Sequence, residues 1–219
     1  MAPLSVRLES LIEDRVLPYL AGFGFDADER VLASRWLAEV RWLVDVEVAP
    51  WSTDERLAFA VSWGVHVPGL EDALGDPEPQ GSDIDACLVH GRLGERPGRV
   101  DPRWFELRTH RGPIGALRDV TLVDAVLHGL RDDVLPALRR LDSPAAVQGV
   151  LHERLVTRRG LPSDEELLTI RRIAALSAVL GDRANAGRWL DHLERRSASA
   201  MAPDVAAARL APLRQRLAS

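Results

Sequence analysis

Two long runs of alternating apolar and polar residues constrain the fold of this chain more than any other feature. The first covers residues 40–48 and the second residues 57–67, and the segment PWSTDE between them holds the turn formers Pro50 and Asp54. Because successive side chains of a strand point to opposite faces, each run predicts a strand with one buried face. Two such strands joined by a short turn predict a long antiparallel hairpin.

The length of the connecting loop predicts the register of this hairpin. A symmetric loop places three pairs of residues opposite each other on the apolar face: Val46 with Phe59, Val44 with Val61, and Trp42 with Trp63. We therefore expect Trp42 and Trp63 to be buried cross-strand neighbours.

Shorter segments complete an α+β fold. Apolar and β-branched residues predict further strands over residues 31–36, 84–89 and 104–108, so that we expect an antiparallel sheet of about five strands built on the long hairpin. Apolar residues at spacings of three and four predict helices over 5–20 and 122–138, which pack on this sheet.

Two similar leucine-proline steps lie inside these helical patterns. They are VLPYL at residues 16–20 and VLPAL at residues 134–138. Proline lacks the amide hydrogen and its ring crowds the preceding turn, so we expect each proline to kink its helix or to mark the last turn.

The last third of the chain predicts helices only. Ser163 with Glu166 has the spacing of a capping box, and Gly181 is a typical helix stop before a further helix. We therefore expect an α+β domain over residues 1–157 and a tail over residues 158–219, formed by a helical hairpin and a final helix and docked on the domain.

Composition excludes several classes of function. The chain has 28 basic and 33 acidic residues and a net charge of -5, so that no general positive field attracts it to nucleic acid or to an anionic membrane. No run of about 18 apolar residues predicts a membrane span. The single cysteine, Cys87, excludes an internal disulfide and fits a reducing compartment, which predicts a cytoplasmic location. The sequence has neither the histidine spacing of a zinc site nor a glycine-rich loop of the kind that binds phosphate. We therefore expect no cofactor.

The segment GSDID suggests one enzymatic alternative. Asp83 and Asp85 stand at alternate positions and would point the same way on a strand, as the metal-binding aspartates of nucleotidyltransferases do. Glu106 on the next strand would supply a third ligand for Mg²⁺ and a triphosphate. The glycine-serine turn expected upstream in such enzymes is absent. The alternative interpretation is that both aspartates begin a strand on its solvent side.

The polar face of the hairpin is the other candidate site. Its residues are Arg41, Asp45, Glu47, Ser62, His66 and Arg108, and either Asp85 or Cys87 would extend it. The small residues Ala58, Ala60 and Gly64 predict a shallow, open face of the kind that a peptide or partner groove requires. A solvated face is, however, the ordinary state of one side of an antiparallel sheet.

The order of these elements resembles a known family. The stretches that carry the resemblance are VLPYLAGFGF, RW, SWGVHVPGL, DACLVHGRL, WFELR and DDVLPALRRL. Together they resemble the bacterial domain-of-unknown-function family 4304 over residues 5–156, and the helical tail looks like an extension of such a domain. These motifs are structural, and the resemblance implies a fold and assigns no catalytic residue.

A full-sized core without a coherent catalytic set favours a non-enzymatic function. We therefore expect a bacterial protein-interaction module, of the immunity-like kind that binds and neutralises a partner protein. The alternative is a metal-dependent nucleotidyl or phosphoryl transferase that uses Asp83, Asp85 and Glu106.

Overall fold

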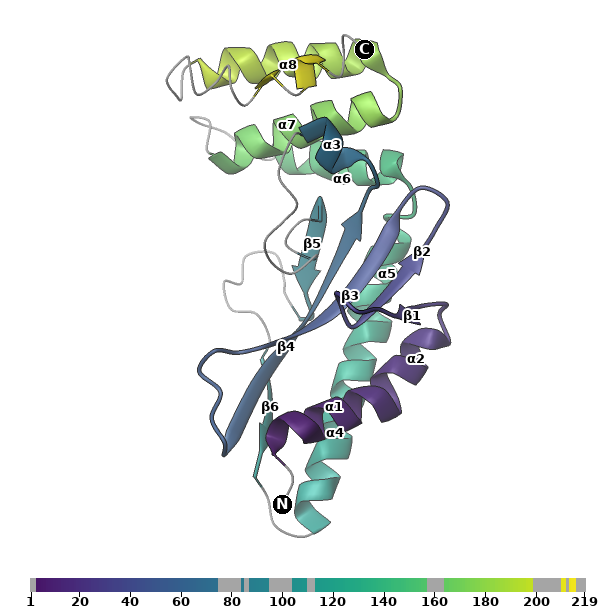
Figure 1. Cartoon of the computed structure of the whole chain (residues 1–219), viewed down its shortest axis with the longest axis vertical. Helices are drawn as coiled ribbons and strands as arrows, with labels where there is room; N and C mark the ends of the chain where they lie inside the picture. The colour runs from purple at the N-terminus through teal and green to yellow at the C-terminus, as the bar shows by residue number, and fades with distance from the viewer. Residues whose placement is uncertain are drawn as a thin grey trace. The chain divides into compact units, whose positions relative to one another are not determined.

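The computed structural model shows an α+β protein, which confirms the expected fold class (Figure 1). The structure describes residues 3–74, 84, 87–94, 104–109, 113–156, 164–198, 210–211 and 213–215. The described strands form one antiparallel sheet and are β1 (Asp26–Ala27), β2 (Ala33–Trp36), β3 (Arg41–Val48), β4 (Arg56–His66), β5 (Val89–Arg92) and β6 (Phe105–Arg108).

Helical segments precede the first strand and follow the last strand in the sequence, and one short helix lies between β4 and β5. The described helical segments are α1 (Leu4–Leu11), η1 (Ile12–Val16), α2 (Leu17–Ala21), α3 (Leu70–Leu74), α4 (Pro113–Gly129), η2 (Leu130–Val134), α5 (Leu135–Arg139), α6 (Pro144–Val156), α7 (Asp164–Val179) and α8 (Arg183–Ser197). Of the predicted final helix, the described residues 210–211 and 213–215 are helical.

Strand β4 is the centre of the sheet. The strands β1, β2 and β3 follow one another on one side of β4, and β5 and β6 both pair with β4 on its other edge. β5 pairs with residues 62–65 and β6 with residues 56–59, so the two short strands lie one after the other along β4. The predicted hairpin and the predicted strand over 104–108 are therefore present.

The register of the hairpin differs from the predicted one. Val46 lies opposite Val61, and Trp42 lies opposite Val65, so that every pair is displaced by two residues. Trp42 is buried, but Trp63 is only half-buried and lies diagonal to Trp42. Since the side-chain period of a strand is two, this displacement changes the partners and leaves each residue on its predicted face.

The loop between β3 and β4 explains the displacement. The Ser52 hydroxyl accepts a hydrogen bond from the Ala58 amide at 3.0 Å and donates one to the Ala58 carbonyl at 3.2 Å. Thr53 and Arg56 then close the turn with main-chain hydrogen bonds in both directions, at 2.7 and 3.2 Å. A serine side chain thus replaces a main-chain partner, and the loop has two extra residues on its β3 side.

The predicted strand over residues 84–89 is also displaced. The strand is β5 (Val89–Arg92), and Ile84 lies in a turn before it. Pairing with β4 begins where the Leu88 amide donates to the Val65 carbonyl. Glycine makes this pairing possible, because a Cβ atom on Gly91 would lie 2.9 Å from the Trp63 ring.

The N-terminal helices and α4 cover one face of the sheet. Side chains from both helical segments and from the sheet surround one small apolar space: Leu8, Leu11, Ile12, Val16, Val46, Phe59, Val61, Leu122, Val123 and Val126. Ion pairs of Arg7 with Asp119 and of Arg15 with Asp124 join the two helical segments at the surface. This face is the apolar core that the alternation predicts.

Both leucine-proline steps follow a widened, π-helical turn. The Leu17 amide bonds to the Ile12 carbonyl and the Leu135 amide to the Leu130 carbonyl, which are five residues earlier. The wider turn gives room to the proline ring, which would otherwise crowd the carbonyl four residues before it. Each helix ends within about one turn after its proline, as expected.

Contacts divide the chain into two compact units. The first contains residues 1–66 and 81–140, and the second contains residues 67–80 and 141–219. In this grouping α3 and α6 belong with the tail, whereas the sequence-based division places both in the first domain.

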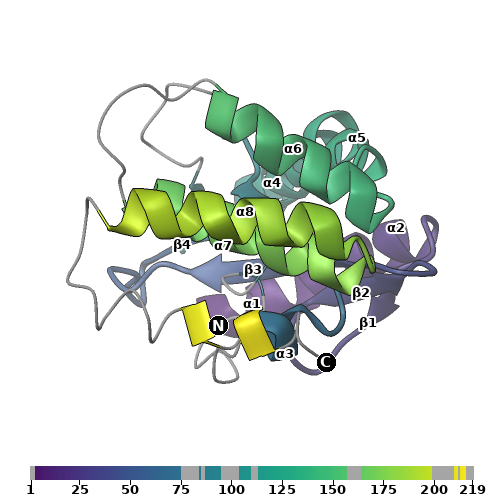
Figure 2. The same ribbon diagram turned by 90° about the horizontal axis from the view of Figure 1, so that it is seen from above.

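The second unit is built around α7. Helices α3, α6 and α8 all contact α7, and Figure 2 shows α7 and α8 side by side. Gly181, with a φ of 75°, ends α7, and the Asp182 amide donates to the Ser177 carbonyl at 2.9 Å. The predicted stop and helical hairpin are therefore present. Ser163 of the predicted capping box lies outside the described residues.

Candidate functional site

All six predicted surface residues lie on the polar face of the sheet, on the side away from α1 and α4. Arg41 lies opposite His66, Asp45 opposite Ser62, and Glu47 opposite Ala60. Arg108 lies opposite Arg56, ten residues along β4 from His66. At about 3.4 Å per residue this is a separation of roughly 34 Å. The six residues therefore form no single cluster, and the face has two distinct ends.

Arg41 organises the first end. Its guanidinium forms an ion pair with Asp28 and lies over the Trp36 ring at 5.2 Å. Asp28 also accepts hydrogen bonds from the Ser34 hydroxyl at 2.7 Å and from the Arg30 amide at 3.0 Å. Burial raises the pKa of Asp28, but these hydrogen bonds and the charge of Arg41 outweigh burial and hold the pKa below its ordinary value.

Trp36 is the most exposed aromatic residue described at this end. Its side chain is 60% exposed, although an indole is among the most apolar surfaces that a protein has. The cation-π contact with Arg41 holds one face of the ring, and Arg41 is itself held by Asp28. The indole is therefore presented to solvent in a fixed orientation.

The middle of the face is covered, which corrects the expectation of an open groove. Cys87 lies against Gly64, where a Cβ atom would come within 2.6 Å of the cysteine Sγ. Together with Ile84, Cys87 forms a buried apolar cluster over Leu43 and Val31. The small residues on β4 leave room for another segment of the same chain.

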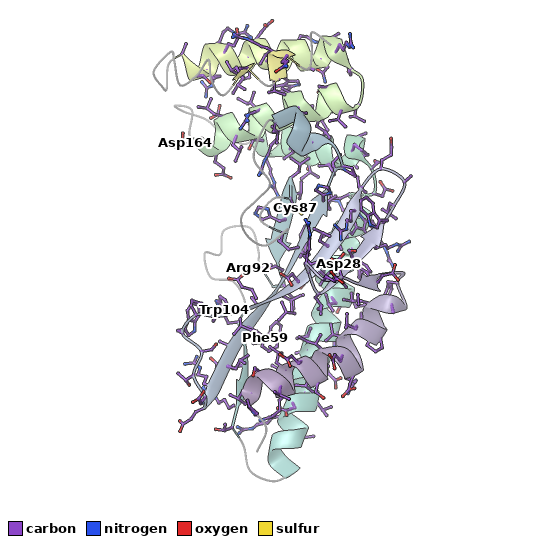
Figure 3. All side chains as sticks on the ribbon, viewed as in Figure 1. Asp28, Phe59, Cys87, Arg92, Trp104 and Asp164 are labelled. Atoms are coloured by element: carbon purple, nitrogen blue, oxygen red, sulfur yellow. The ribbon has the colours of Figure 1, made fainter. Side chains whose placement is uncertain are left out.

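Tryptophans organise the second end of the face. Arg92 forms an ion pair with Glu47 and lies over the Trp104 ring at 5.6 Å. Figure 3 labels Arg92 and Trp104. Trp51 meets Trp104 edge-on at 4.8 Å, and its side chain is 55% exposed. At this end the arginine that a carboxylate holds therefore contacts Trp104, and Trp104 in turn contacts the exposed Trp51.

The alternative metal site is only partly within the described residues. Asp83 and Asp85 lie outside them, and β5 begins four residues after Asp85. Glu106 accepts hydrogen bonds from Arg56 and Arg108, and these lower its pKa. Its charge is thus already balanced by two guanidinium groups. No group of three or more histidine, cysteine or acidic residues suited to a metal occurs in the described part of the chain.

Helix α8 carries a hollow that the sequence reasoning missed. Its volume is about 280 Å³, and its described lining residues are Asn185, Arg188, Trp189 and His192. These positions follow the spacing i, i+3, i+4 and i+7, which places them on one side of a helix. That spacing is visible in the sequence, but it is also the spacing of an ordinary helix face, and His152, which stacks on Trp189, is far away in the chain.

Comparisons with protein-family models, with curated proteins and with solved structures found no match for this chain. Among the described helices, none combines the length and the apolar character needed to cross a membrane.

Proposed function

We propose that this chain is a bacterial, cytoplasmic protein-interaction module that binds its partner through the polar face of the sheet. The observation that carries the proposal is the pair of exposed tryptophans, Trp36 and Trp51, at the two ends of this face. Tryptophan and arginine are the residues most enriched in the energetically dominant positions of protein interfaces.

The two ends are suited to binding because their groups are held in place before a partner arrives. Arg41 is fixed by Asp28, and Arg92 by Glu47. An indole that is already oriented loses little conformational entropy on binding, so more of its buried apolar area contributes to affinity. The separation of the ends suits a partner protein with an extended contact surface rather than a small substrate.

A partner-neutralising role of the immunity-like kind remains our preferred form of this function. It requires a stable fold and a recognition surface, and it requires no catalytic residue. The transferase alternative depends on Asp83 and Asp85, and its third ligand, Glu106, is engaged by two arginines.

The test uses variants of the exposed tryptophans in the intact chain. Tagged wild type, Trp36→Ala and Trp51→Ala are used to purify partners from the native host under identical conditions. Leu117→Ala is the matched control, because Leu117 is also highly exposed but lies on α4. We expect a partner that wild type and the control retain and that both tryptophan variants lose, with unchanged melting temperatures. If all four proteins retain the same partners, the sheet face is not the binding surface.

A further inference from the structure

The hollow on α8 has an aromatic wall. The Trp189 indole stacks on the His152 imidazole with centroids 5.1 Å apart and planes 26° apart. His192 meets the same indole edge-on at 5.7 Å and 82°. Both Trp189 and His192 line the hollow, so an incoming planar group meets aromatic surface there.

The histidine beneath Trp189 acts as an aromatic support. Burial lowers the pKa of His152, and its Nε2 atom is buried without a hydrogen-bond partner among the described residues. A neutral imidazole stacked on the indole holds Trp189 from one side. The indole therefore has a fixed position within the wall.

The hollow is also lined by an arginine side chain, Arg188. Arg188 is exposed and forms no ion pair or hydrogen bond with any residue that the structure describes. Elsewhere in this unit, Arg196 is paired with Glu166 and Arg214 with Glu194. An unengaged guanidinium at the edge of an aromatic wall is the arrangement that binds a carboxylate or a phosphate.

Asn185 adds a directional acceptor. Its Nδ2 donates to the Ser177 hydroxyl at 3.3 Å, and Ser177 is fixed by a hydrogen bond from Gln148 at 2.6 Å and by its own bond to the Ile173 carbonyl at 2.9 Å. This network orients the amide, so Oδ1 is left to accept an N–H group in the hollow. It is the only asparagine in the chain.

We propose that this hollow binds a mononucleotide, with the base on Trp189, a base N–H group on Asn185 and the phosphate on Arg188. Its volume of about 280 Å³ lies just below the usual range of small-molecule sites, which limits the ligand to one small molecule. The site lies in the second unit and is separate from the sheet face of the proposed function. Its failure would leave that function untouched.

The first experiment separates the two halves of the ligand. The full-length protein is titrated with adenosine monophosphate, adenosine and ribose 5-phosphate by isothermal calorimetry. We expect binding of the monophosphate, and binding at least about tenfold weaker for each half alone, because stacking and the charge-assisted contact each contribute about that factor. Absence of binding by the monophosphate, or equal binding of adenosine, overturns the proposal.

The second experiment tests the residues. Arg188→Ala is expected to weaken monophosphate binding by about tenfold or more, and Arg188→Lys by less. Arg183→Ala is the matched control, since Arg183 is exposed on the same helix and is not among the lining residues; it leaves the affinity unchanged. An equal loss in both alanine variants contradicts a specific site. Tighter binding of a 5′-phosphorylated oligonucleotide than of the monophosphate would assign the hollow to nucleic-acid ends and overturn a mononucleotide.

Discussion

At the scale of single residues, close contacts and charge pairs decide how the polar face is built. Gly64 lets Cys87 pack directly on β4, and Asp28 holds Arg41 beneath the exposed Trp36. Neither contact follows from a residue's own neighbours in sequence, because each joins segments more than ten residues apart. Both are testable by substitutions that change only a few atoms.

Gly64→Ala is expected to destabilise the protein by about 1 to 3 kcal/mol. The added Cβ would lie 2.6 Å from the Sγ of Cys87, so β4 or the covering segment must move. Gly149→Ala is the control, since nothing lies within 4 Å of its Cβ position in helix α6, and alanine there should stabilise by up to about 1 kcal/mol. Denaturant unfolding measures both. Equal stability of Gly64→Ala and wild type would mean that Cys87 does not pack on Gly64.

Asp28→Asn is expected to destabilise the protein at neutral pH and much less in acid. Because the pKa of Asp28 is lower in the folded state, its carboxylate stabilises the fold above about pH 3.8, the ordinary value. This stabilisation is lost as the pH falls through the lowered pKa. Urea unfolding of both proteins between pH 7 and pH 3 should therefore show a difference that narrows toward acid. A difference that is constant across this range would contradict the charge pair as its cause.

At the scale of elements, the spacing of apolar residues explains the two π-helical turns. The N-terminal helix has apolar residues at every fourth position, and so does the segment from α4 to α5: Leu4, Leu8, Ile12, Val16 and Leu20, and Leu122, Val126, Leu130, Val134 and Leu138. In an α-helix a spacing of four drifts by about 40° per step, since one turn has 3.6 residues. One wider turn reduces this drift and keeps each row on one side of its helix, where Val16, Leu130 and Val134 are buried.

Deleting Asp132 tests this interpretation of η2. Without one residue the turn becomes α-helical, and the Pro136 ring then crowds the carbonyl four residues before it, which the wide turn avoids. We expect a loss of about 3 kcal/mol, which is the usual cost of a proline inside an α-helix. Asp132→Ala keeps the chain length and should change stability by no more than about 0.5 kcal/mol, because Asp132 is exposed. Equal stability of the deletion variant and the alanine variant would show that the wide turn is not required.

At the scale of the whole molecule, the two units are not consecutive in the sequence, because a segment of the second unit interrupts the first. Residues 67–80 carry α3 into contact with α7, and residues 81–140 then return to the sheet and its helices. Arg171 of α7 donates a hydrogen bond to the Leu74 carbonyl at the end of α3. The second unit is therefore completed by a short segment taken from the middle of the α+β region.

Leu70→Ala tests whether α3 stabilises the second unit. Leu70 is buried, and we expect a loss of about 2 to 5 kcal/mol in that unit. Hydrogen exchange of the intact chain should show faster exchange in α7 and unchanged exchange in α4, because local stability follows the unit that has lost the contact. An equal increase in α4 would show that the two units open together.

The sequence by itself determined the secondary structure of the long hairpin and which side chains share a face. The reason is that apolar and polar residues alternate with a period of two along a strand that has one buried face. It also determined the helix stop at Gly181, since only the local backbone is involved. The displacement of the register required the structure, because the Ser52 side chain replaces a main-chain partner.

Only the tertiary structure decided what covers the polar face and where the candidate sites lie. Cys87 on Gly64 closes the middle of the face, and His152 stacks on Trp189, which lines the hollow on α8. The physical reason is the same in both cases. Periodicity records whether a side chain is buried, whereas the partner that buries it is chosen by the packing of segments distant in the chain.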